Sequence, residues 1–423
     1  MKKTIVVVED NQIVAAIYRS KLQAEGFLVE VAVDGQGGLE MIERTRPDLV
    51  LLDLVLPKLS GVEVLKQLRA QPDFQALPVI VFSSSYVSDE AWEAGATQVL
   101  NKASHSPKLV VEKVKTLLAA TLTPLMPAKN SQLPKIMTSF PAKATVINLN
   151  EDERFQAEMR KTFHTDVPET VSALSASLQA FVKTPNDPAH SYDLYRKIHA
   201  VSGIAGLSGL RRIALLSAPL EAFFKVLSAN PKQINSSALR TAVQSIEFLI
   251  LLFEQPSGGQ SAELVTSFDA LVVDDEELTR RAVSDALEKA ELRCLRIADS
   301  QTALKVLGEN QFNLLFIDIE MPELNGLELC LKLRELPMYK ETPVVFMTSL
   351  SKFEQQVAIA ERAAFEIIAK PFHHTEAAAK ALTLLLKSLI KNQEPDEFKC
   401  KNQDSTNSKP AYNLKTNSYT RHI

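Results

Sequence analysis

Acidic side chains, a hydroxyl and a lysine occur twice in this chain, in the same order and each directly after an apolar run. The first copy holds Glu9, Asp10, Asp53, Ser83 and Lys102, and the second holds Asp274, Asp275, Asp318, Thr348 and Lys370. The spacing from residue 10 to 53 equals that from 275 to 318, and the spacing from 53 to 83 equals that from 318 to 348. A repeat of this detail predicts two copies of one domain.

Converging carboxylates repel one another unless a cation lies among them, and oxygen ligands beside a phosphate favour Mg²⁺. The lysine adds a positive charge and the hydroxyl adds a hydrogen-bond donor. Together these groups can hold a phosphoryl group on an aspartate and neutralise charge as it transfers. The predicted metal ligands are Glu9, Asp10 and Asp53 in one copy and Asp274, Asp275 and Asp318 in the other. The simpler interpretation, helix capping by Asp10 and Asp275, leaves the other acids, the lysines and the hydroxyls unexplained.

His199, between the two copies, is a second candidate for chemistry. At helical spacing an apolar face forms that consists of Leu194, Ile198, Val201 and Ala205. His199 points about 130° away from the centre of this face. Gly203 and Gly206 lie within roughly 40° of His199, although each helical glycine costs about 1 kcal/mol relative to alanine. Bare space of this kind lets another protein surface approach the imidazole. The alternative is a solvent-facing histidine on a bundle helix.

The elements that position these residues follow from the apolar runs. Residues 1–122 alternate amphipathic helices with continuous apolar strands near 4–8, 27–32, 48–52, 78–82 and 97–101, and residues 269–392 repeat this pattern. Continuous Val/Leu/Ile strands are typical of a parallel sheet covered on both faces. We therefore predict a doubly wound α/β domain at each end, with strand order 2-1-3-4-5 and the acids together at the carboxyl ends of the strands.

The residues between these domains have a different pattern. Residues 151–256 show helices near 152–163, 168–183, 188–205, 208–229 and 233–254 and no strands, which predicts an all-α bundle. Residues 123–150 read as a proline-rich linker with one short strand at 145–147, and residues 257–268 as a flexible linker. Residues 393–423 are polar and predicted to be disordered.

Composition narrows the class of protein. A net charge of −4 over 423 residues gives no indication of a nucleic-acid-binding surface. The three cysteines are far apart and fit a reducing cytoplasm better than a disulfide framework or a zinc site. No run reaches the roughly 18 apolar residues of a membrane span, so no direct membrane insertion is expected.

Both α/β units resemble bacterial response-regulator receiver domains, which have a flavodoxin-like fold. The middle region resembles histidine phosphotransfer (HPt) domains, whose motif His199, Gly203 and Gly209 fit. The resemblance implies aspartyl phosphorylation at Asp53 and Asp318, phosphohistidine at His199, and bound Mg²⁺.

The chain departs from the family patterns in three places. Ser202 stands where HPt domains usually have a lysine, and Arg196, one turn before His199, could supply the missing charge. The first copy is shorter between hydroxyl and lysine, from 83 to 102 against 348 to 370. It also lacks the proline that follows Lys370.

Because the linker before the second α/β unit is the shorter one, we expect His199 to exchange phosphate mainly with Asp318, leaving Asp53 to an outside partner.

The predicted function is that of a phosphorelay intermediary of a two-component system, not an enzyme. No nucleotide-binding loop is found, so a separate sensor histidine kinase acting in trans would supply the phosphoryl group. A downstream response regulator or effector would receive it. One alternative is a phosphorylation-dependent scaffold or phosphate sink with an inactive HPt domain. Another is an Mg²⁺-dependent hydrolase.

Overall fold

The structure is a computed structural model that describes residues 2–83, 88–101, 107–120, 149–255, 268–362 and 365–393. The predicted lysine Lys102, the short strand expected at 145–147 and nearly all of the polar tail lie outside these residues. The side chain of Ser83 lies outside the description as well.

The first α/β domain has a five-stranded parallel sheet in the order β2-β1-β3-β4-β5, which confirms the predicted order. Its strands are β1 Thr4–Val8, β2 Leu28–Ala32, β3 Leu49–Asp53, β4 Val79–Ser83 and β5 Gln98–Asn101. Its helices are α1 Gln12–Ala24, α2 Gly35–Thr45, α3 Gly61–Ala70, α4 Ser88–Glu93 and α5 Pro107–Ala120. Every residue of the central strand β3 is buried, because helices cover both faces of the sheet.

The second α/β domain repeats this topology in the order β7-β6-β8-β9-β10. Its strands are β6 Asp269–Val273, β7 Arg293–Ile297, β8 Leu314–Asp318, β9 Val344–Ser349 and β10 Glu366–Lys370. Its helices are α10 Glu277–Lys289, α11 Ser300–Glu309, α12 Gly326–Glu335, α13 Leu350–Arg362 and α14 His374–Gln393. The shortening predicted for the first copy falls in its fourth helix, since α4 has 6 residues and α13 has 13.

The helical region between the domains consists of α6 Leu149–Lys183, α7 Pro188–Leu207, α8 Arg211–Ala229 and α9 Ser236–Glu254. The prediction of two helices before residue 184 was wrong, because α6 runs through Pro168 as one helix of 35 residues. A proline inside a helix removes one backbone hydrogen bond. Buried apolar side chains before and after Pro168, among them Phe163 and Leu174, stabilise the continuous helix by packing in the core. Phe163 stacks on Phe253 of α9 with ring centroids 5.2 Å apart.

Helix α9 is long and apolar enough to cross a membrane by length and composition alone. In this structure 56% of its most apolar window is buried, and it contacts α6, α8 and α14. Its apolar character is explained by its place in the core of the protein.

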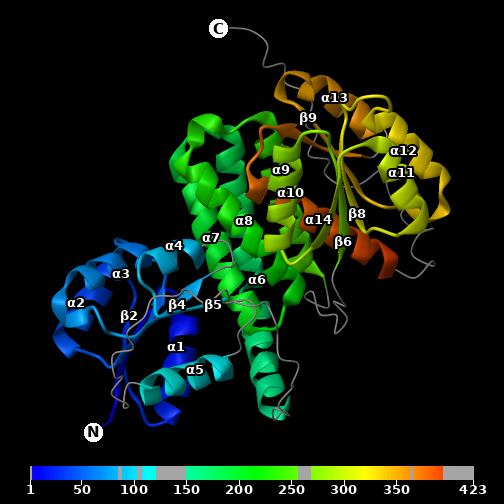
Figure 1. Cartoon of the computed structure of the whole chain (residues 1–423). Coiled ribbons are helices and arrows are strands. Elements are labelled where there is room, and N and C mark those ends of the chain that lie inside the picture. Colours follow the sequence, from blue (N-terminus) through cyan, green and yellow to red (C-terminus); the bar gives the residue numbers. More distant parts are fainter. Residues whose placement is uncertain are drawn as a thin grey trace, which may run out of the picture.

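Figure 1 shows the helical region between the two α/β domains, which are attached to it differently. Helix α14 of the second domain packs against α8 and α9, and one continuous apolar core joins the two parts, including Leu249 and Phe224 on one side and Leu382 and Leu385 on the other. The first domain has an apolar cluster on each face of its sheet, and it contacts the helical region through Leu207 of α7, which joins one of these clusters, and through Val55, which joins the core of the helical region. It meets the helical region near the carboxyl ends of its strands.

Candidate functional site

The carboxyl ends of β1 and β3 bring Asp10 and Asp53 together. These strands are parallel neighbours in which Val8 pairs with Leu52, so the residues that follow emerge at one edge of the sheet. The turn after Asp53 passes so close that a Cβ on Gly61 would lie 1.9 Å from the Asp53 backbone oxygen. Glycine is therefore required there, and at Gly326 in the second domain, where a Cβ would lie 2.1 Å from the Asp318 backbone oxygen.

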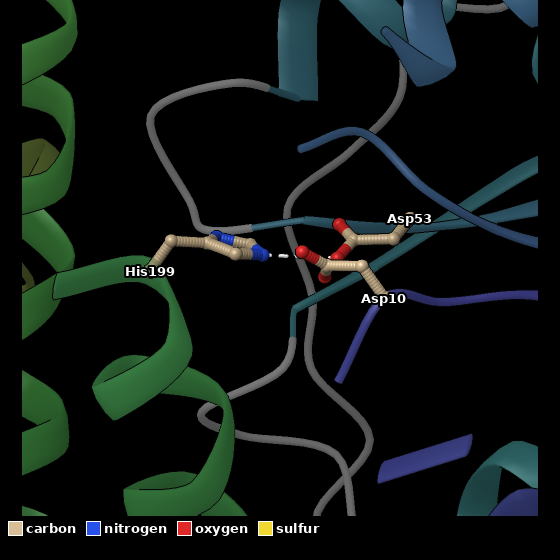
Figure 2. A group of neighbouring side chains, drawn as sticks. All are labelled: Asp10, Asp53 and His199. Atoms are coloured by element: carbon tan, nitrogen blue, oxygen red, sulfur yellow. Dashed lines mark hydrogen bonds and ion pairs between the residues drawn. The ribbon is translucent and has the colours of Figure 1, made fainter. Parts of the chain in front are cut away.

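His199 lies directly on this edge of the first domain. Its Nε2 is 2.9 Å from Oδ2 of Asp53, although 146 residues separate the two in sequence. Figure 2 shows the imidazole extending from its helix toward Asp53 and Asp10. Only 5% of His199 and 1% of Asp53 are exposed, so the pair is closed to solvent. The solvent-facing interpretation is wrong, and the prediction of a protein surface close to the imidazole nitrogen is confirmed.

Glu221 of α8 binds the other ring nitrogen of His199. Its Oε1 is 3.0 Å from Nδ1, and only 1% of Glu221 is exposed. A carboxylate accepts hydrogen bonds only, so each ring nitrogen faces an acceptor: Nδ1 faces Glu221 and Nε2 faces Asp53. Sequence reasoning missed Glu221. The available signal was a single acid within the otherwise apolar stretch from Ala218 to Phe224.

Two ion pairs flank the His199–Asp53 contact. Arg196 Nη2 lies 2.6 Å from Oδ2 of Asp10. Lys225 on α8 lies 2.8 Å from Glu90 on the short helix α4.

This arrangement contradicts the expectation that Asp318 is the intramolecular partner of His199. In the described part of the chain, the second domain packs on the helical region through α14 and β10, and Asp274, Asp275 and Asp318 make no hydrogen bond or ion pair to that region. Among the described contacts, the partners of Asp318 are Lys370 and the backbone of Glu320, both in its own domain.

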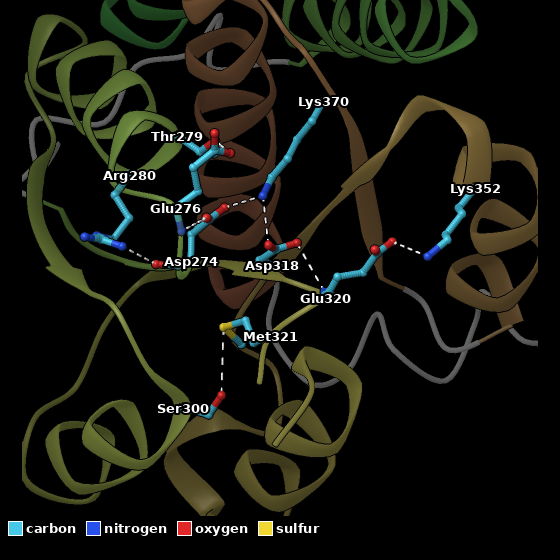
Figure 3. A network of polar contacts seen from close by, with 10 residues as sticks. All are labelled: Asp274, Glu276, Thr279, Arg280, Ser300, Asp318, Glu320, Met321, Lys352 and Lys370. Carbon is cyan, nitrogen blue, oxygen red and sulfur yellow. Dashed lines mark hydrogen bonds and ion pairs between the residues drawn. The ribbon is translucent and has the colours of Figure 1, made fainter. Parts of the chain in front are cut away.

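The second domain assembles the predicted group of Asp274, Asp318 and Lys370. The Lys370 amine lies 2.6 Å from Asp274 and 2.8 Å from Asp318, and Figure 3 shows it between the two carboxylates. Thr348, at the end of the neighbouring strand, is 1% exposed, and its hydroxyl has no hydrogen-bond partner in the described structure. A hydroxyl of this kind can donate to a phosphoryl oxygen.

Burial and charge act in opposite directions in this second site. Burial raises the pKa of Asp318 above its ordinary value, and the hydrogen bond from Lys370 opposes that shift. Burial also raises the pKa of Asp274 against the same lysine. Burial lowers the pKa of Lys370, but its hydrogen bonds to the two aspartates outweigh this effect and the pKa is raised overall. The lysine is therefore held charged, while the aspartates favour further positive charge nearby.

The described residues fit a divalent cation in both domains. Asp274, Asp275 and Asp318, which we call the second acidic cluster, offer carboxylate oxygens that lie within 4.8 Å of one another. In the first domain the corresponding group is Asp10, Asp53 and His199. Glu9 is 5% exposed and is not a member of that group. Oxygen donors of this type suit Mg²⁺.

Comparison with known proteins identifies both α/β domains. The response regulator receiver domain family matches residues 5–114 and 270–382, more than half of the chain. The chain therefore belongs to the response regulator receiver family, with one receiver at each end, and this supports its assignment to two-component response regulation.

Each curated relative matches a stretch of this chain about as long as one receiver domain. The alkaline phosphatase synthesis transcriptional regulatory protein PhoP of Bacillus subtilis is 36% identical over 119 residues, which cover 28% of this chain and 49% of that protein. Response regulator MprA of Mycobacterium leprae is 37% identical over 120 residues, covering 28% of this chain and 51% of that protein. The chain thus spans about half the length of these curated relatives. The solved Francisella response regulator 1452 receiver domain is 27% identical, with 28% of this chain and 99% of that chain covered and a TM-score of 0.27.

Proposed function

We propose that this protein is a phosphorelay intermediary in which His199, on an HPt-like helical region, exchanges a phosphoryl group with Asp53 of the first receiver. The observation that carries the proposal is the 2.9 Å contact between His199 Nε2 and Asp53 Oδ2, with Glu221 on the opposite nitrogen. A nucleophile held at the acceptor carboxylate and oriented by a third group is the arrangement that group transfer requires.

The transfer step is balanced as follows. The phosphorus–oxygen bond of phosphorylated Asp53 breaks and its electron pair returns to the carboxylate. The reacting form is the neutral imidazole with its single hydrogen on Nδ1, so the free lone pair of Nε2 forms the new phosphorus–nitrogen bond and no proton leaves Nε2. Nδ1 keeps its hydrogen and donates it in a hydrogen bond to Glu221. The negative charge of Glu221 stabilises the positive charge that develops on the ring. The reverse step uses the same groups.

Divalent metal would act at the receivers. Asp10 and Asp53 in the first, and the second acidic cluster in the second, are the residues that would hold Mg²⁺. When bound, the ion neutralises phosphoryl oxygens during transfer. Lys370 and Thr348 provide a further charge and a donor at Asp318, and by the repeat Lys102 and Ser83 take these roles at Asp53.

A separate sensor histidine kinase would supply the phosphoryl group in trans, and a downstream response regulator or effector would receive it. In this proposal the chain works in the cytoplasm and receives its phosphoryl group from another protein. Its proposed function is to pass a phosphoryl group between protein side chains rather than to convert a small-molecule substrate.

The test is to load the full chain with labelled acetyl phosphate and Mg²⁺ and to separate acid-labile phosphohistidine from base-labile phosphoaspartate. Phosphohistidine is expected at His199, and Asp53→Asn should abolish it while Asp318→Asn preserves it. Equal phosphohistidine in Asp53→Asn would refute the assignment of Asp53. No phosphohistidine in any variant would favour the scaffold or phosphate-sink alternative.

A further inference from the structure

Arg196 makes a contact that the transfer step itself does not use. Its guanidinium binds Oδ2 of Asp10 at 2.6 Å, and the two side chains are 30% and 18% exposed. Arg196 lies three residues before His199 on α7, so both project from the same face of the helix. The helix therefore presents one positive group to Asp10 and an imidazole to Asp53.

This contact uses an oxygen that a divalent cation would also require. Asp10 and Asp53 have carboxylate oxygens within 4.8 Å of each other, a distance at which one ion can bind both. In the arrangement seen here, with the helical region against the first receiver, Arg196 contacts Oδ2 of Asp10 and His199 contacts Oδ2 of Asp53. A guanidinium and a metal ion cannot both occupy the same position on Oδ2 of Asp10, since they would repel each other and overlap.

The second receiver shows the same repeat without this contact. Asp275 is the counterpart of Asp10, and it is exposed. Among the described residues no arginine or lysine binds it. Leu278, the counterpart of Ile13, is 74% exposed, whereas Ile13 lines a crevice against α6 and α7. In the part of the chain that the structure describes, the helical region thus covers the acidic edge of the first receiver and leaves Asp275 of the second exposed.

We propose that Arg196 is a positioning residue that docks His199 onto Asp53 by binding Asp10 in place of a divalent cation. Docking and cation binding at the first receiver then oppose each other, and by linkage each weakens the other by the same factor. The cation level would set how often the helical region leaves Asp53. This consequence rests on the proposed function, whereas the competition itself involves no phosphate.

The experiment measures Mn²⁺ binding by electron paramagnetic resonance in the full, unphosphorylated chain. An Asp318→Asn background weakens the second acidic cluster, so that binding reports on the first receiver. Arg196→Ala should tighten Mn²⁺ binding at least about fivefold, a typical size for coupling between two sites. Arg196→Lys keeps a positive charge and should restore most of the original affinity.

Lys197→Ala is the matched control. It also removes one positive charge from α7, but Lys197 pairs with Asp193 of its own helix. Unchanged Mn²⁺ affinity in a folded Arg196→Ala protein would overturn the inference, as would an equal gain in Lys197→Ala. If alanine unfolds the chain, Arg196→Gln replaces it, with the same outcomes. Failure of the proposed function would appear separately, as missing phosphohistidine with the Mn²⁺ competition intact.

Discussion

Glu221→Gln tests whether the buried carboxylate behind His199 assists phosphoryl transfer. The substitution keeps an oxygen that can accept the Nδ1 hydrogen at the observed 3.0 Å but removes the negative charge. A hydrogen bond to a charged group contributes about 1.5–3 kcal/mol and a neutral one about 0.5–1.5 kcal/mol. The ring gains positive charge as Nε2 bonds to phosphorus, so the difference, about 1–2 kcal/mol, is felt in the transition state. Transfer should therefore slow roughly 5- to 30-fold.

The assay is a single-turnover, rapid-quench measurement of acid-labile phosphate after Asp53 has been loaded. Asp193→Asn is the control, because it removes a carboxylate from α7 that binds Ser177 and Lys197 and does not contact His199. A Glu221→Gln protein that melts normally and transfers within twofold of the original rate would refute the role given to Glu221. An equal loss in Asp193→Asn would mean that the effect is structural.

Three further perturbations follow from the same contacts. Gly203→Leu should leave the helices intact by circular dichroism yet block transfer, because Gly203 is buried one turn after His199 and a side chain there would force the first receiver away; full transfer would contradict this. Labelling of Asp318 by acetyl phosphate should stop in excess EDTA, because the second acidic cluster otherwise repels the donor; persistent labelling would show that no cation is needed. Burial raises the pKa of Glu376, so the folded state holds its proton more tightly, and the resulting stability is lost as pH rises above the ordinary value of 4.5. Glu376→Gln should therefore gain thermal stability relative to the original protein as pH increases, and a difference independent of pH would argue against this.

The receiver sites could be predicted from the sequence because parallel strands fix where their ends meet. Once the repeat gave the strand order, Asp274 and Asp318 had to emerge side by side at one edge of the sheet. His199 could be found because its two neighbouring glycines have no other evident use in a helix. These inferences need only local periodicity and topology.

The partner of His199 could not be predicted in the same way. Linker length sets how often two domains meet but not which faces they present. The buried face of α14, with Glu376 bonded to Ser237 of α9, turns the second receiver so that its fifth helix faces the helical region. Glu221 was missed for a related reason, since the register between α7 and α8 depends on side-chain packing across two helices.

The two attachments also differ in how readily they can open. The second receiver shares a continuous apolar core with the helical region, and separating them would expose both that core and the buried Ser237–Glu376 contact. The first receiver is held by the buried His199–Asp53 pair and by apolar contacts that include Val55 of the receiver and Leu207 of α7. It is also held by partly exposed ion pairs such as Lys225–Glu90, which typically contribute no more than about 1 kcal/mol each. An exchangeable attachment is what a relay needs at the residue that must receive phosphate and then release its partner. In the proposed relay we therefore expect the first receiver to be the one that leaves His199, while the second, which shares more of the apolar core, stays attached with Asp275 and Leu278 exposed.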